Sequence, residues 1–67
     1  MNKALLRSIM VLHNDTSQSL AEYLGISAKS VNDKINENNT EFRQSEIAAI
    51  KKRYSLSNEQ VSNIFFN

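Results

Sequence analysis

The sequence predicts an all-α domain of five short helices, and three features of its 67 residues indicate this. Proline is absent and glycine occurs once, so the residues that most often interrupt regular elements are almost missing. Apolar residues recur at helical intervals, and no segment alternates polar and apolar residues for long, as a half-buried strand would. Nine asparagines and nine serines supply candidate helix caps. The length fits one domain over residues 1–67.

Hydrophobic periodicity places the helices along the chain. The segments with helical spacing are residues 3–13, 17–24, 28–36, 44–54 and a short stretch after Ser57. The apolar residues expected to face inward are Leu5, Ile9, Leu12, Leu20, Ala21, Leu24, Val31, Ile35, Ile47, Ile50, Tyr54, Val61 and Ile64. Phe42 is expected to anchor the polar loop between the third and fourth helices. A single core to which every helix contributes is therefore predicted.

Polar residues at the segment ends predict where the helices begin and end. Asp15 or Thr16 can accept from the free N–H groups of the second helix, and Ser27 can do so for the third. Gly25 follows the second helix, where a left-handed residue commonly ends a helix. Residues 57–60 form a capping box for the last helix, with serine first and glutamine fourth.

Composition argues against several classes of function. The absence of cysteine excludes a disulfide framework and Cys-ligated zinc. A single histidine, His13, leaves no metal cluster and no nucleophile–base pair, so we expect neither an enzyme nor a cofactor. No apolar run approaches the ~18 residues of a membrane span, and no signal-peptide pattern opens the chain. The expectation is a cytoplasmic domain with no membrane contact and no small-molecule ligand.

Residues 17–36 combine the parts of a helix-turn-helix, the plan in which a second helix enters the major groove of DNA. Ala21 is small where two helices must cross closely, Gly25 permits a sharp turn, and Ile26 fills that turn from inside. The residues expected to anchor the second helix to the first are Val31 and Ile35.

The chain resembles the Cro/CI family, also called lambda-repressor-like or XRE, in the run Leu20-Ala21-x-x-Leu24-Gly25-Ile26-Ser27-x-x-x-Val31-x-x-x-Ile35-Asn36. Two later stretches are similar to small phage-type repressors and Cro proteins of that family, namely Phe42-x-x-x-Glu46-Ile47 and Ile64-Phe65-Phe66. The resemblance covers essentially the whole chain and implies a compact five-helix DNA-binding domain. Two positions depart from the family pattern: Ser17 stands where glutamine is frequent, and Glu37 where glycine is usual.

The outward side of the third helix carries side chains that suit base recognition. Lys29 can donate to guanine and Asn32 can pair with adenine. Asp33 can accept from cytosine, and the Ala28 methyl group can meet a thymine methyl. The resemblance implies that these four residues contact bases.

Small polar groups at a helix N-terminus bind phosphate, so Ser17 and Gln18 at the start of the second helix are expected to hold the DNA backbone. The resemblance implies the same role for Asn36 and the loop after it. Arg43, at the end of that loop, is expected to reach either the backbone or the minor groove. The full set of expected backbone contacts is Ser17, Gln18, Ser27, Ser30, Asn36, Asn38 and Arg43. Lys34 flanks the third helix, where solvation and phosphate contact are both open alternatives. Residues 51–53, which are Lys-Lys-Arg, either form a phosphate patch or complement the C-terminus of their own helix. In the loop, Asn38 or Asn39 is expected to take the left-handed conformation.

Three consecutive large apolar residues, Ile64, Phe65 and Phe66, end the chain's apolar pattern. Either the first two close the monomer core, or the segment 57–67 forms a homodimer seam, which the resemblance favours. A two-fold dimer would recognise a pseudo-palindrome with half-sites about 34 Å apart.

The sequence as a whole predicts a sequence-specific transcription regulator, a repressor or Cro-like protein, that binds double-stranded DNA as a homodimer. Its net charge of +1 is low for this class, so weak non-specific affinity is expected. The alternative is a protein-interaction module on the same scaffold, for example an antirepressor that binds another phage-type regulator, because fold does not fix function.

Overall fold

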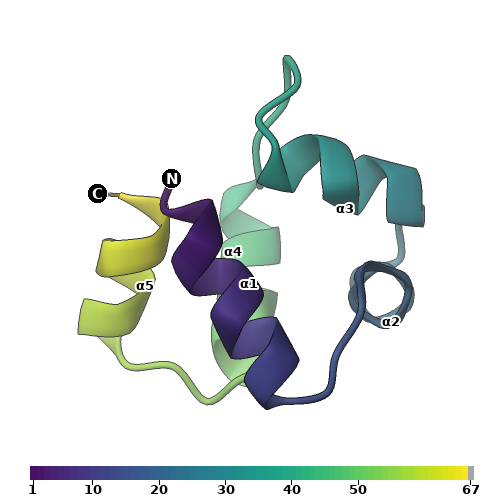
Figure 1. The fold of residues 1–67 in the computed structure, drawn as a ribbon. Helices are drawn as coiled ribbons and strands as arrows, with labels where there is room; N and C mark the ends of the chain where they lie inside the picture. Colours follow the sequence, from purple (N-terminus) through teal and green to yellow (C-terminus); the bar gives the residue numbers. More distant parts are fainter. Residues whose placement is uncertain (67) are drawn as a thin grey trace.

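The computed structural model describes residues 1–66, which form five α-helices and no strand (Figure 1). The helices are α1 (Lys3–Leu12), α2 (Ser17–Leu24), α3 (Ala28–Ile35), α4 (Gln44–Arg53) and α5 (Asn58–Phe65). The all-α prediction is confirmed, and the first four helices begin and end within one residue of their predicted limits. No helix in this part of the chain combines the length and the apolar character needed to cross a membrane.

The helices fall into two groups that face each other (Figure 1). Helix α1 lies beside α5 and in front of α4, while α2 and α3 lie together on the other side of the molecule. The view runs along the axis of α2 but shows α3 from the side, so these two helices cross rather than run parallel. The start of α1 is tied to the end of α5, because the N–H of Asn2 donates to the carbonyl of Ile64 at 2.7 Å.

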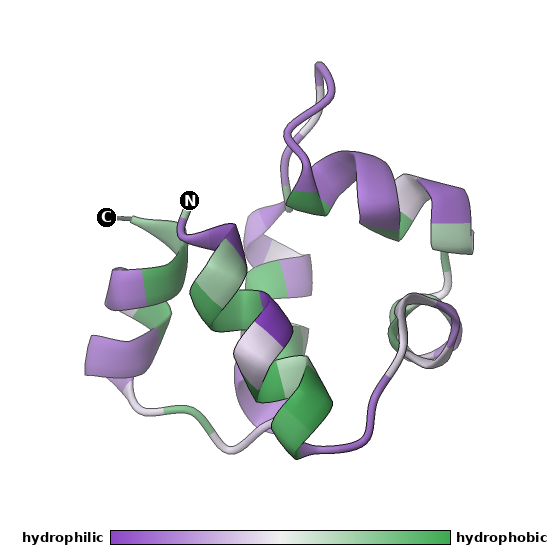
Figure 2. Ribbon diagram, viewed as in Figure 1, coloured by the Kyte–Doolittle hydropathy of each residue, from purple (hydrophilic) through white to green (hydrophobic). Residues whose placement is uncertain are grey.

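The hydrophobic core draws buried side chains from all five helices, and apolar residues occur on each of them (Figure 2). Its fully buried large side chains are Leu6, Leu20, Val31, Ile35, Ile50 and Ile64. The expected inward faces of α2 to α5 are confirmed, with Leu24 only partly buried, and Phe42 is buried as the predicted loop anchor. Burial of these residues fixes the register of α3 and turns its polar side outward.

The predicted buried face of α1 is only partly confirmed: Leu5 and Ile9 pack against the core, but the assignment of Leu12 is wrong. The buried residues of this helix are Leu6 and Met10, whereas Leu5 and Ile9 are partly buried and Leu12 is 79 % exposed. Two apolar stripes run side by side along α1, and both satisfy the helical spacing. Packing against the other helices selects the stripe one residue further along, which the periodicity of α1 alone does not reveal.

The caps of the helix-turn-helix segment follow the prediction. Thr16 is the N-cap of α2, and its hydroxyl accepts from the N–H of Ser19 at 3.1 Å. Ser27 caps α3 in the same way. Gly25 ends α2 with φ at +75°, a left-handed conformation that costs glycine little. Asp15, the other candidate for the α2 cap, has a different role described below.

The capping box of α5 is also confirmed. The hydroxyl of Ser57 accepts from the N–H of Gln60 at 3.1 Å, and the Gln60 amide oxygen accepts from the N–H of Ser57 at 2.8 Å. In the loop before α4, Asn39 is left-handed with φ at 60°, as one of the two predicted alternatives. Glu37 is left-handed as well, with φ at 56°, at the position where the resembling family carries glycine.

Candidate nucleic-acid interface

The residues predicted to contact bases share the outward side of α3. Lys29 and Asn32 are exposed, and Ala28 and Asp33 are partly exposed. The buried residues of the same helix are Val31, Lys34 and Ile35. The outer surface of α3 is therefore a polar ridge, and Figure 2 colours most of this helix as hydrophilic.

Two of these residues neutralise each other. Lys29 Nζ lies 2.8 Å from Asp33 Oδ2, one helical turn along α3. The hydrogen bond from Lys29 lowers the pKa of Asp33, and the same bond raises the pKa of Lys29, so both groups stay charged near neutral pH. Asn38 Nδ2 also approaches Asp33 Oδ1, at 3.5 Å. A base that engages either group shares it with a bond already made within the protein.

A second contact joins α3 to the start of α2. Ser17 Oγ donates to Asn32 Oδ1 at 2.7 Å. Ser17 was predicted to hold phosphate and Asn32 to contact a base, and the structure brings them together. The bond fixes the Asn32 side chain relative to the N-terminus of α2.

The other predicted backbone contacts are spread around this ridge. Gln18 lies in the first turn of α2, Ser27 is the N-cap of α3, and Asn36 is its C-cap. The two residues furthest along the chain, Asn38 and Arg43, are exposed in the loop and at its end. Ser30 is partly buried in the first turn of α3. Gln18, Ser27, Ser30 and Asn36 thus lie on α2 and α3 themselves, whereas no contact with α3 fixes the Arg43 side chain there.

One cation near the ridge was missed by sequence reasoning. Arg7 of α1 is exposed, and its Nη2 donates to Asn36 Oδ1 at 3.0 Å. The two residues are 29 positions apart, so no local pattern could have joined them.

Lys34 is neither solvated nor available to a phosphate, and both predicted alternatives are wrong. It is 7 % exposed, and its Nζ lies 2.8 and 3.1 Å from the two carboxylate oxygens of Glu46. Burial raises the pKa of Glu46, but the N–H of Arg43 and the ammonium of Lys34 outweigh it, so the pKa falls below its usual value. The pair joins α3 to α4.

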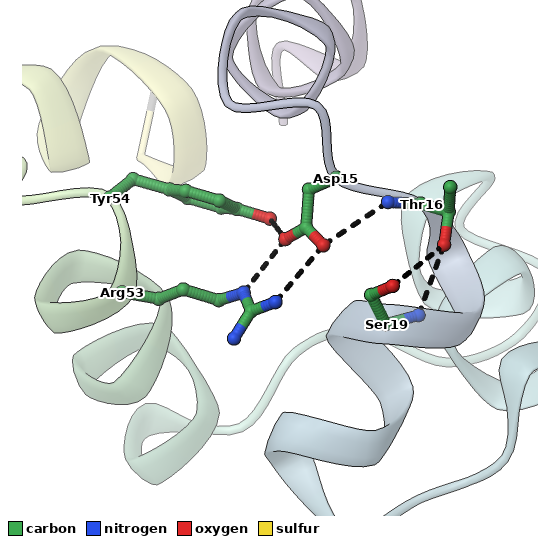
Figure 3. A network of polar contacts seen from close by, with 5 residues as sticks. All are labelled: Asp15, Thr16, Ser19, Arg53 and Tyr54. Carbon is green, nitrogen blue, oxygen red and sulfur yellow. Dashed lines mark hydrogen bonds and ion pairs between the residues drawn. The ribbon is translucent and has the colours of Figure 1, made fainter.

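A second polar network holds the turn before α2 (Figure 3). Asp15 accepts two hydrogen bonds from the Arg53 guanidinium, at 2.7 and 3.0 Å, and a third from the hydroxyl of Tyr54. The N–H of Thr16 donates to the same carboxylate at 3.2 Å. The hydrogen bond from Arg53 is the largest influence on the pKa of Asp15, and it lowers that pKa despite burial.

Aromatic side chains complete this network. The Arg53 guanidinium lies 4.7 Å from the centre of the Tyr23 ring, and the rings of His13 and Tyr54 are 5.0 Å apart. Residues 51–53 all lie in the last turn of α4, as one of the two predicted alternatives requires, and Arg53 also pairs with Asp15. Burial is the largest cause that raises the pKa of Tyr54. These contacts hold the end of α4 against the turn that precedes α2.

The three apolar residues predicted for a dimer seam differ in exposure. Ile64 is fully buried in the monomer core, so its assignment to a seam is wrong. Phe65 is partly buried and packs edge-on against Phe42, with ring centres 5.9 Å apart. Phe66 is 60 % exposed beside a cavity of about 230 Å³ that Phe42, Ile47 and Phe65 help to line. Asn67, the last residue of the predicted segment 57–67, lies outside the described residues.

No family model, no curated protein and no solved structure matches the chain. The resemblance to the Cro/CI family therefore rests on the residues of the sequence alone. Within residues 1–66, no group of three or more His, Cys, Asp or Glu side chains is arranged to hold a metal ion. The surface around α2 and α3 remains the strongest candidate for a functional site.

Proposed function

We propose that the protein is a sequence-specific DNA-binding regulator of transcription of the Cro/CI type, which works in the cytoplasm by inserting α3 into the major groove. The observation that carries the proposal is the crossing of α2 and α3 about a left-handed Gly25, with a polar ridge on the outer side of α3. This is the geometry of a recognition helix set by its partner helix.

The ridge divides into base and backbone contacts. Ala28, Lys29, Asn32 and Asp33 contact base edges, where the donors and acceptors of the major groove differ between base pairs. The backbone contacts fall to Ser17, Gln18, Ser27, Ser30, Asn36, Asn38 and Arg43. Because Lys29 is paired with Asp33, the face offers little net charge, and selectivity rests on hydrogen bonds to bases rather than on attraction to phosphate.

Removal of a base contact should weaken and broaden recognition. We expect Lys29→Ala and Asn32→Ala each to cost about 1–3 kcal/mol in binding to the preferred duplex. The measurement is selection of bound duplexes from a random pool at ~150 mM salt, followed by titration of the enriched sequence. The matched controls are Lys52→Ala and Asn63→Ala, which remove the same side-chain types from exposed positions on α4 and α5. If the folded wild type enriches no sequence, the DNA-binding proposal fails.

The proposal includes a homodimer, because one small module makes few base contacts and a two-fold dimer doubles them. The surface that supports it is Phe66, a large exposed apolar side chain at the edge of a cavity of mixed lining, in which Phe42, Ile47 and Phe65 lie beside charged residues. In a two-fold interface, the same patch meets itself, so Phe66 of each protomer can enter the cavity of its partner.

Replacement of Phe66 by serine should separate the protomers. Sedimentation velocity is expected to show a dimer for the wild type and a monomer for Phe66→Ser at the same concentration, with weaker binding to a two-fold duplex. Leu12→Ser provides the control, because Leu12 is 79 % exposed on a different helix. A dimer that survives Phe66→Ser would contradict this interface.

A second candidate function is a protein-interaction module that binds another regulator. One observation favours it: two adjacent apolar side chains at the end of α1, Val11 and Leu12, are 74 % and 79 % exposed. The two functions separate in the variants above, since Lys29→Ala and Asn32→Ala would leave the affinity for a protein partner on α1 unchanged.

A further inference from the structure

We propose that Arg7, on α1, binds a phosphate of the DNA backbone at the C-terminal end of α3. The inference rests on the proposed function and adds a third helix to the interface. Its geometric basis is the 3.0 Å hydrogen bond from the Arg7 guanidinium to the side chain of Asn36, the C-cap of α3. This bond holds the guanidinium beside a residue already expected to face the backbone.

The lysines of α3 itself do not supply an unpaired cation for a phosphate. Both lysines of α3 are paired with carboxylates, Lys29 with Asp33 and Lys34 with Glu46. Their contributions to the field at the DNA surface therefore largely cancel. Among the described residues, Arg7 has no carboxylate within ion-pair distance. Arg7 thus supplies net positive charge next to α3, in addition to that of the exposed Arg43 in the loop before α4.

The position of Arg7 also fits the path of a DNA strand. Arg7 and Ser17 line the same open hollow of about 290 Å³, which reaches the end of α3 at Ile35. Asp15 lines this hollow too, but two hydrogen bonds from Arg53 balance its charge. A backbone that passes from the start of α2 to the end of α3 crosses in front of Arg7.

The chemistry of the guanidinium suits the task. Arginine carries five N–H donors in a planar fork, and the bond to Asn36 occupies one of them. The remaining donors can make paired hydrogen bonds to phosphate oxygens, a geometry that lysine does not offer. Asn36 then acts as a support that orients the fork.

The test is the salt dependence of binding to a synthetic 24-base-pair duplex that carries the sequence enriched in the selection described above, measured by fluorescence anisotropy. One lost phosphate contact should reduce the slope of log affinity against log salt by about 0.9 and the affinity at ~50 mM salt roughly tenfold. We expect this for Arg7→Gln, whereas Arg7→Lys should keep the slope. Thermal unfolding of each variant verifies that the fold is intact.

The control is Lys51→Gln, which removes one positive charge from a residue bonded to Asn58 at the start of α5, on the far side of the molecule from α3. It should leave the slope unchanged. If Arg7→Gln and the wild type have the same slope, or if Lys51→Gln lowers it equally, the role of Arg7 is refuted while DNA binding stands. If the wild type does not bind the duplex at ~50 mM salt, both the proposed function and this inference fail.

Discussion

Replacement of Asp15 by alanine is expected to lower the free energy of unfolding by about 3 kcal/mol, the lower end of the range for a broken buried ion pair. The Asp15 side chain is 5 % exposed and accepts from Arg53, Tyr54 and the N–H of Thr16. Its loss leaves the Arg53 charge without a partner, but 27 % of that side chain still reaches water, which moderates the cost. A chain of this length has only ~3–10 kcal/mol of stability in total, so the variant should lose from about a third to all of its free energy of unfolding.

Urea unfolding of Asp15→Ala beside Glu22→Ala measures this effect. Glu22 is an exposed acid of α2, so its removal should change stability by no more than about 0.5 kcal/mol. Because the pKa of Asp15 is lowered on folding, its contribution is complete above the ordinary value of 3.8 and is lost as the pH falls through the folded pKa. Equal stability of the two variants near neutral pH would show that the network contributes nothing.

Replacement of Lys34 by methionine should cost about 3–5 kcal/mol near neutral pH, because it leaves the buried Glu46 carboxylate without its cation. Burial alone raises the pKa of Glu46, so in this variant the carboxyl should take up a proton more readily. In Lys34→Met, a pKa of Glu46 that is raised on folding adds to the free energy of unfolding at low pH, and this addition is lost as the pH rises. The deficit relative to the wild type should therefore shrink between about pH 7 and pH 4.

The matched variant is Lys34→Met/Glu46→Gln, which removes both charges and keeps an amide oxygen that can accept from the N–H of Arg43. Its stability near neutral pH should return to within about 1 kcal/mol of the wild type, as for other buried pairs replaced by neutral residues. Denaturant unfolding at both pH values measures the three proteins. The buried pair would be contradicted if Lys34→Met were as stable as the wild type, or if its loss of unfolding free energy did not change with pH.

The parts of the fold that sequence predicted are those determined by neighbouring residues. Helices α2 and α3, their caps and the left-handed Gly25 depend on contacts within a few positions, and periodicity and cap chemistry describe such contacts directly. The buried faces of these helices follow because each carries one apolar stripe. Helix α1 carries two adjacent stripes, so its orientation depended on partners that the local pattern does not identify.

The charged contacts of the candidate site could not be predicted in the same way. Asp15 and Thr16 are both suitable N-caps, and only the presence of Arg53, 38 positions away, assigns Asp15 to another task. Lys34 sits at the edge of an amphipathic helix, where Glu46 of α4 converts a surface position into a buried one. Arg7 of α1 and Asn36 at the end of α3 are 29 positions apart, so only the tertiary fold brings them together.

Under the proposed function, the pairing of both α3 lysines with carboxylates has a consequence for the rate at which the protein leaves DNA. Residence on arbitrary DNA depends on phosphate neutralisation, so a protein with few unpaired cations near its recognition helix dissociates quickly and slides over short distances. Its search for an operator would proceed mainly through repeated collisions from solution, and operator occupancy would follow the protein's concentration closely. The operator would then be occupied when the protein's concentration rises and vacated when it falls, without a separate inducer.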